Sequence, residues 1–182
     1  MSIKPGTYAL GPDRGTLLVK TKRAGAAAVA GHDLTIEVTS WNATLDLAAD
    51  PGQSAIALEA DARSLRVREG TGGIQKLGED DKDGIRQTIE DEVLRHPVIE
   101  FRSSTVDADT GSDRLHVRGD LQLAGRGAPI TFELILGEDG RLIGSATVKQ
   151  TAWGVKPYSA LFGTLKVADE VKVTIDAALS VG

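Results

Sequence analysis

The feature that most constrains the fold is a two-residue alternation of apolar and polar side chains. Within residues 114–123 the odd positions from Leu115 to Leu123 are apolar or glycine, and the even positions are polar. Because successive side chains on a strand point to opposite faces, the segment is predicted as a β-strand with one buried face. The same reasoning predicts strands at 130–136 and 171–179. Further strands are expected at 16–22, 34–47 (two strands or one bent strand), 54–61, 98–106 and 141–149.

Glycine-containing turns separate several of these segments. Residues 109–111, 125–127 and 138–140 each supply glycine where a hairpin turn favours positive φ. About eight short antiparallel strands with one apolar face indicate an all-β barrel or sandwich, and closure into a barrel would remove exposed edges. A chain of 182 residues is compatible with one domain, so residues 1–182 are predicted to form a single domain.

One segment departs from the alternation and is predicted to be a short helix over residues 80–94. Ile85, Ile89 and Val93 are spaced by four residues and form one apolar stripe. Acidic residues stand at its start, where the helix dipole favours negative charge, and Pro97 ends it at or before His96. The preceding stretch, 68–78, is rich in glycine and charge and is interpreted as a mobile connection.

Composition excludes several classes of function. The net charge is −5 and the chain has only seven aromatic residues, so a nucleic-acid partner is not expected. The absence of cysteine excludes thiolate chemistry and disulfides, and neither a catalytic metal nor a cofactor is expected. The first eight residues lack an apolar signal region and no window is apolar enough to span a membrane, so a cytoplasmic protein without an integral membrane segment is predicted.

Gly31-His32-Asp33 is the first candidate for chemistry. His32 could act as a general base with Asp33 as its carboxylate partner, or could hydrogen-bond a polar ligand end at a barrel mouth. In the structural alternative, Asp33 caps backbone N–H groups and His32 bonds a carbonyl. His96 is expected at a helix C-terminus and His116 on an exposed strand face.

The interior of such a barrel can be filled or hollow. Eight strands enclose space for either packed side chains or one small ligand. With few aromatic residues the lining would be Leu, Ile, Val and Ala, which leaves room, whereas the usual density of protein interiors favours a solid core.

The order and spacing of several motifs resemble the YceI-like family, lipocalin-like β-barrels associated with polyisoprenoids and similar long apolar ligands. The resemblance spans nearly the whole chain and includes the helix that runs into His96-Pro97. The matching segments are 8–13, 30–34, 96–103, 117–121, 123–125, 153–158 and 165–169.

The resemblance implies a lipocalin-like antiparallel barrel with an elongated apolar cavity and the helix across one opening. The leading hypothesis is therefore non-catalytic binding or carriage of a polyisoprenoid, quinone-like or fatty acyl or amide lipid. The alternatives are an enzyme that uses His32 and Asp33 on an apolar substrate, and a solid barrel that serves as an interaction module. The oligomeric state, including a homodimer, stays open. The residues expected to contact the ligand are Leu17, Val19, His32, Ile56, Leu58, Ile89, Phe101, Val117, Phe132 and Trp153.

Overall fold

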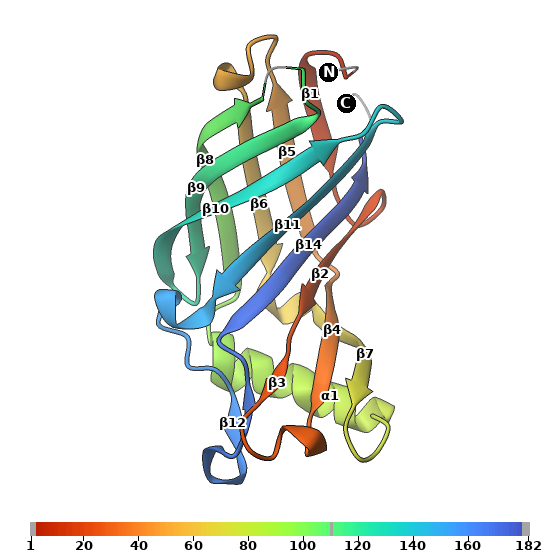
Figure 1. The fold of residues 1–182 in the computed structure, drawn as a ribbon, viewed down its shortest axis with the longest axis vertical. Coiled ribbons are helices and arrows are strands. Elements are labelled where there is room, and N and C mark those ends of the chain that lie inside the picture. The colour runs from red at the N-terminus through yellow and green to blue at the C-terminus, as the bar shows by residue number, and fades with distance from the viewer. Residues whose placement is uncertain (1–2, 110, 180–182) are drawn as a thin grey trace.

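The computed structural model describes residues 3–109 and 111–179 and consists mainly of antiparallel strands (Figure 1). The helical part is α1 (Glu79–Thr88), which continues as the π-helical segment η4 (Ile89–Leu94). Short 3-10 turns are η1 (Ala28–Ala30), η2 (Pro51–Gln53), η3 (Ala62–Ser64), η5 (Gln150–Trp153) and η6 (Leu161–Gly163). The strands are β1 (Gly6–Leu10), β2 (Gly15–Lys20), β3 (Arg23–Ala24), β4 (His32–Val38), β5 (Trp41–Leu47), β6 (Ala55–Asp61), β7 (Leu65–Gly72), β8 (Val98–Ala108), β9 (Arg114–Leu123), β10 (Arg126–Leu136), β11 (Arg141–Lys149), β12 (Ser159–Ala160), β13 (Leu165–Val167) and β14 (Glu170–Ala178).

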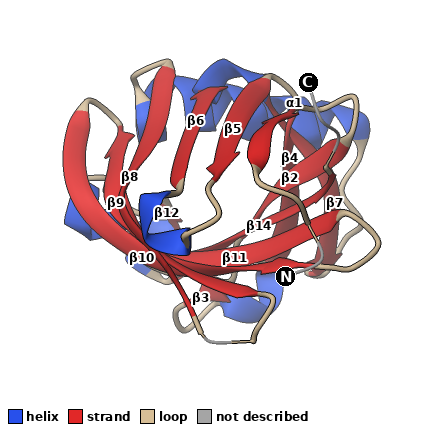
Figure 2. Cartoon of the chain, turned by 90° about the horizontal axis from the view of Figure 1, so that it is seen from above, coloured by secondary structure: helices blue, strands red, loops and turns tan. Residues whose placement is uncertain are grey.

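Eleven of these strands form one sheet in the order β1-β5-β6-β8-β9-β10-β11-β14-β2-β4-β7. The pairing registers show that three pairs of them are the halves of bent strands. The three bent strands are β1 with β2, β4 with β5, and β6 with β7. β1 pairs with β5 and β2 pairs with β4, while β5 also pairs with β6 and β4 also pairs with β7. When each bent strand is counted once, the described residues form a barrel wall of eight strands, and the pairing of β14 with β2 closes the barrel. The expected antiparallel barrel of about eight strands is confirmed, and Figure 2 shows its strands arranged around a central axis.

A buried serine holds the corner where the bent strands change direction. The Thr39 N–H donates to the Ser64 carbonyl over 3.1 Å, and the Asp61 N–H donates to the Ser40 carbonyl over 3.0 Å. The Ser64 hydroxyl accepts from the Ser40 N–H at 3.0 Å and donates to the Asp61 carbonyl at 2.7 Å. Because the backbone groups at the corner find partners there, the strands bend without leaving buried groups unsatisfied.

The predicted strands at 114–123 and 141–149 coincide with β9 and β11, and the segment 34–47 is one bent strand divided into β4 and β5. The interpretation of 68–78 as a mobile connection is wrong in its first half, because residues 65–72 form β7 and pair with β4. The glycines there serve close packing, since a Cβ at Gly70 would collide with Leu77 and one at Gly72 with Arg23. β1 was also not predicted from the alternation.

The barrel interior has a packed end and a hollow end. Near the β1 end, where the described chain also begins and ends in Figure 1, fully buried side chains fill the space between the strands. α1 and η4 cross the opposite end beside β7, and β3, β12 and β13 extend the wall there (Figure 1). None of the helices within residues 3–109 and 111–179 has the length and apolar character to span a membrane. The side chains of the packed end include Tyr8, Leu47, Val106, Leu115, Val117 and Leu136.

Gly119 offers a test of the packing between β8 and β9. A Cβ at this position would lie 2.6 Å from the Phe101 ring and would collide with the Arg102 carbonyl oxygen. We expect Gly119→Ala to lower the free energy of unfolding by about 1–3 kcal/mol, because the backbone itself blocks the added methyl group. Urea unfolding monitored by circular dichroism measures the change.

The matched control is Gly84→Ala in α1, where an added Cβ meets nothing within 4 Å. The same substitution there should raise the free energy of unfolding by up to about 1 kcal/mol, because alanine is the better helix former. Equal effects of the two changes would contradict this account of Gly119.

Candidate functional site

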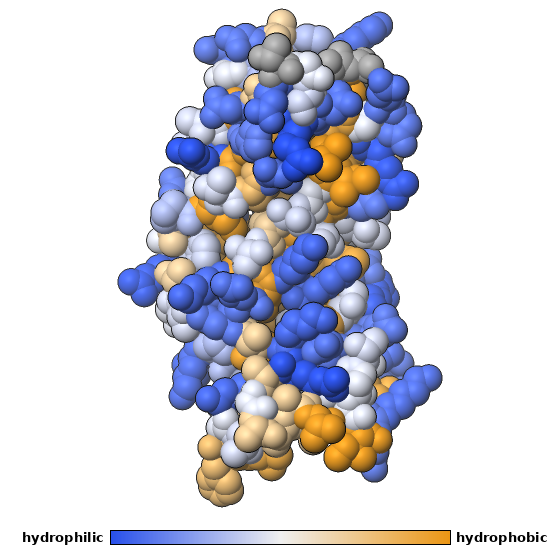
Figure 3. Space-filling view, viewed as in Figure 1, coloured by the Kyte–Doolittle hydropathy of each residue, from blue (hydrophilic) through white to orange (hydrophobic). Residues whose placement is uncertain are grey.

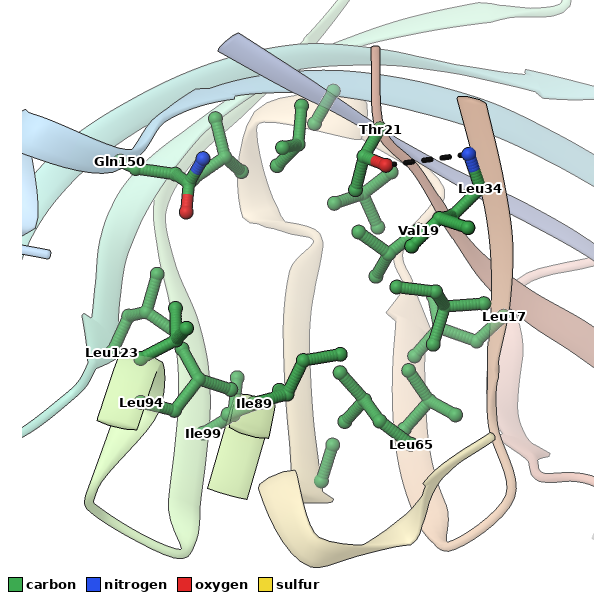
Figure 4. A pocket seen from close by; sticks show the side chains of 18 of the residues that line it. Leu17, Val19, Thr21, Leu34, Leu65, Ile89, Leu94, Ile99, Leu123 and Gln150 are labelled. Carbon is green, nitrogen blue, oxygen red and sulfur yellow. Dashed lines mark hydrogen bonds between the residues drawn. The ribbon is translucent and has the colours of Figure 1, made fainter. Parts of the chain in front are cut away.

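The hollow end of the barrel encloses a cavity of about 730 Å³. Ligand pockets typically measure about 300–1,000 Å³, so this cavity is of a size that holds a substantial molecule. Alternate residues of the strands point into it, as the alternation predicts. Figure 4 shows aliphatic side chains arranged around an open centre, among them Leu17, Val19, Leu65 and Leu123.

α1 and η4 close one side of the cavity with the predicted apolar stripe. Ile85, Ile89 and Val93 all line the cavity. The helix begins at Gly78, whose N–H donates to the Asp81 carboxylate at 2.8 Å, and it ends at Arg95, which adopts a left-handed conformation with φ of 54°. Carboxylates in the first turn also favour the helix through its dipole. An amphipathic helix with a stabilised start thus covers the hollow end.

Two aromatic rings contribute to the strand wall of the cavity. Phe101 on β8 and Phe132 on β10 meet edge to face, with ring centroids 5.1 Å apart and planes at 60°. Edge-to-face geometry is a favoured arrangement of aromatic pairs, so each ring fixes the orientation of the other. Both rings line the cavity and give it a rigid patch within an otherwise aliphatic surface.

Few polar side chains reach the lining, and the two buried ones bond the barrel wall. The Thr21 hydroxyl accepts from the Leu34 N–H at 3.3 Å, and the Gln150 side-chain amide donates to the Ala168 carbonyl at 3.0 Å. Figure 4 shows the side-chain oxygen of Gln150 directed toward the open centre. Hydrogen bonding of these groups to the wall limits the cost of placing them beside apolar surface.

The mouth of the cavity lies between the start of α1 and the hairpin of β12 and β13. Five of the six exposed residues that line the cavity gather there, namely Asp80, Asp81, Gly84, Tyr158 and Lys166, whereas the sixth, Ser145, lies on β11. Sequence reasoning did not identify any of these five as site residues, because they belong to the helix or to the short segment around β12 and β13, where strand alternation carries no information.

His32 and Asp33 point in different directions, as neighbours on a strand do. His32 lines the cavity and its Nε2 lies 2.6 Å from the Gln75 carbonyl, to which it donates. Asp33 lies outside the cavity and accepts from the Arg23 N–H at 2.9 Å and from the Lys22 ammonium at 3.2 Å. The structure therefore does not bring the two side chains together as a base and its carboxylate partner.

The hydrogen bonds at Asp33 also change its acidity. The backbone N–H of Arg23, with a smaller contribution from the Lys22 ammonium, holds the pKa of Asp33 below its ordinary value. Both donors stabilise the ionised carboxylate, which joins β4 to the chain leading into β3. Asp33 thus makes the bond to a backbone N–H group that the structural alternative expects.

Eight of the ten residues expected to contact a ligand line the cavity, and two do not. Val117 is fully buried at the packed end, beyond the cavity, where it faces Val106 and Phe132 on the neighbouring strands. Trp153 lies in the η5 turn, where the strand alternation is interrupted, and packs in a separate cluster with Val148. The residues that line the cavity are Leu17, Val19, His32, Ile56, Leu58, Ile89, Phe101 and Phe132.

The other two histidines lie away from the cavity lining. His96 follows the helix and its Nδ1 accepts from the Val98 N–H at 3.4 Å, while the two ring nitrogens of His116 lie 3.2 Å from carboxylate oxygens of Asp109 and Glu133. Among the residues that the structure describes, no three His, Asp or Glu side chains are placed together to hold a metal ion.

Comparison with known proteins agrees with this architecture. The model of the YceI-like domain matches residues 8–179. The chain belongs to the YceI-like family. Members of this family are known for binding polyisoprenoids and other apolar ligands. No curated protein matches the sequence.

Two solved structures show the same fold at low sequence identity. BcnA of Burkholderia cenocepacia is 18% identical, with a TM-score of 0.67 over 92% of this chain and 97% of that protein. The YceI protein of Campylobacter jejuni is 13% identical, with a TM-score of 0.56 over 81% of this chain and 85% of that protein. The YceI-like barrel is therefore preserved while most side chains differ.

The ionised state of Asp33 predicts a pH-dependent contribution to stability. Because its pKa is lower in the folded protein than in the unfolded chain, the carboxylate stabilises the fold above the unfolded value of 3.8, and this contribution is lost as the pH falls through the folded pKa. We expect Asp33→Asn to be less stable than the wild type near pH 7, and the difference to shrink toward zero below the folded pKa. Urea midpoints across this range test it, and a difference independent of pH would contradict the assignment.

Proposed function

We propose that this YceI-like protein binds one long apolar ligand in the hollow end of its barrel and carries it without catalysing a reaction. The observation that carries the proposal is the cavity of about 730 Å³, whose lining is dominated by Leu, Ile and Val side chains. An aliphatic cavity of this size provides affinity for a chain of methylene or isoprene units and few hydrogen-bonding groups to orient a polar substrate.

Burial of the chain supplies the binding energy. At about 25 cal/mol per Å² of apolar surface, a ligand chain that loses roughly 400 Å² of contact with water gains on the order of 10 kcal/mol before the costs of association. A filled core would provide no such gain, so the cavity favours the carrier over the solid interaction module.

The arrangement of polar groups sets the expected orientation of the ligand. The deep wall is apolar, whereas Asp80, Asp81 and Lys166 stand at the mouth. A ligand with one polar end would place its chain inside and its polar end toward these residues, where water remains accessible. Polyisoprenoids, quinone-like molecules and fatty acyl or amide lipids share this division into a long apolar part and one polar end.

The geometry of His32 and Asp33 gives no support to the enzyme alternative. Each side chain already bonds backbone groups of the mouth, and they do not contact each other. We therefore propose that His32 positions the segment around Gln75 beside the ligand rather than transferring a proton.

Organic extraction of the purified protein followed by mass spectrometry tests the carrier function directly. Native mass spectrometry of the same preparation gives the stoichiometry. One long-chain species per protein molecule is the expected result. A ligand-free protein that stays so after incubation with prenyl alcohols and fatty amides would contradict the proposal.

The substitution Phe132→Asp tests the location of the site. A carboxylate in the aliphatic lining would have to be desolvated by a bound chain, so we expect loss of the extracted lipid. Thr131→Asp is the matched control, because Thr131 is the preceding residue on β10 and points to solvent. Unchanged lipid content in a folded Phe132→Asp protein would place the ligand elsewhere.

A further inference from the structure

Three loops at the mouth of the cavity carry exposed apolar side chains. We call residues 22–31, 72–78 and 156–166 the mouth loops. Val29, Ile74 and Leu161 are 74%, 77% and 59% exposed, and Phe162 is fully exposed. These loops form the lower end of the molecule in Figure 1, and Figure 3 shows apolar surface gathered there. Apolar side chains that cluster in solvent typically mark a surface used for interaction.

The backbone holds the most exposed of these side chains outward. Leu161 and Phe162 have φ of 51° and 54°, so two consecutive residues with a Cβ adopt the left-handed conformation. This conformation is unfavourable for such residues and persists where surrounding bonds impose it. Here the Thr164 N–H and hydroxyl both donate to the Leu161 carbonyl, at 3.1 and 2.7 Å, and the Ala27 N–H donates to the Thr164 carbonyl at 2.8 Å.

The charges of the mouth loops are of one sign. They contain five basic residues and no acidic one, in a chain whose net charge is −5. The neighbouring Asp33 is paired with Lys22 and Arg23. The start of α1 adds Glu79, Asp80, Asp81 and Asp83 beside the mouth loops; Glu79 pairs with Lys82, Asp83 pairs with Arg86, and Asp81 accepts from the Gly78 N–H. Apolar tips among basic side chains complement a membrane surface that contains anionic lipids, which attracts Lys and Arg. The basic residues are Lys22, Arg23, Lys76, Lys156 and Lys166.

The mouth loops are continuous with the cavity. Ala30, Gly31, Tyr158 and Leu165 belong to these loops and also line the cavity. We propose that the mouth loops dock on the surface of a lipid bilayer, with Val29, Leu161 and Phe162 entering its interfacial region. An apolar chain then passes between bilayer and cavity without crossing water. This transfer step rests on the proposed function, whereas docking itself does not.

Flotation with lipid vesicles tests the docking. The full chain is mixed with vesicles of phosphatidylcholine, with or without phosphatidylglycerol. We expect the wild type to float with the vesicles, and more of it to float when phosphatidylglycerol is present. Phe162→Asn should lower the vesicle partition coefficient about tenfold or more, since it removes a large inserted side chain. Asparagine tolerates the left-handed conformation, so the loop can keep its shape.

Ile143→Asn is the matched control, because Ile143 is a 44% exposed apolar residue on β11, outside the mouth loops. It should leave flotation unchanged. Failure of the wild type to float, or equal flotation of Phe162→Asn, would overturn the docking proposal. So would a wild-type dimer in sedimentation that Phe162→Asn dissociates and that does not bind vesicles, because the apolar tips would then belong to a contact between two copies.

Native mass spectrometry of the same proteins separates docking from carriage. Phe162→Asn that retains its lipid but no longer floats supports docking and leaves the carrier function intact. A wild type that floats but never holds a lipid would leave docking standing while the proposed carrier function fails.

Discussion

The hydrogen-bonded pairing of β14 with β2 is the interaction on which the rest of the structure depends. It runs from Gly15 opposite Ala177 to Lys20 opposite Lys172 and joins the two ends of the chain around the barrel. A Cβ at Gly15 would lie 2.8 Å from the Ala177 Cα, so glycine allows the close approach that this pairing needs. Without the pairing, the cavity would be an open groove with its apolar lining in water. Backbone hydrogen bonds thus close the barrel, and the side chains that line it give the cavity its shape and apolar surface.

The packed end of the barrel stabilises the fold, whereas the hollow end provides the space for a ligand. Side chains at the packed end are in close contact all round, which is where dispersion and burial contribute most. Side chains around the cavity lack partners on one side and contribute less to the stability of the empty protein. The barrel can sustain this hollow because its strands are held on both sides by neighbouring strands and because α1 and η4 cover one opening.

The sequence allowed the strands and the helix stripe to be predicted because both depend on local periodicity. The alternation in β9 and β11 and the spacing of Ile85, Ile89 and Val93 were sufficient. β7 was not predicted, because its pairing with β4 is made by backbone groups and its glycines leave space for the side chains of Leu77 and Arg23. A local sequence pattern does not show that these side chains pack there. Val117 was assigned to the correct face of β9 but to the wrong depth, since alternation gives the face of a strand and not the position along the barrel axis. Trp153 lies in the η5 turn, where no strand alternation applies. The mouth, with Tyr158 and Lys166, depends on loops that converge only in three dimensions.

The helical segment has a consequence for how such a protein can diversify. α1 and η4 occupy the connection between β7 and β8, so they contribute none of the wall pairings that close the barrel. Substitutions or length changes in this connection can therefore reshape the helical cover of the cavity while the strand register stays fixed. Selection for a longer or shorter cargo can act on residues such as Ile85 and Ile89 almost independently of selection for folding. Ligand preference can consequently change within the family faster than architecture, as expected where barrels coincide at 18% and 13% identity.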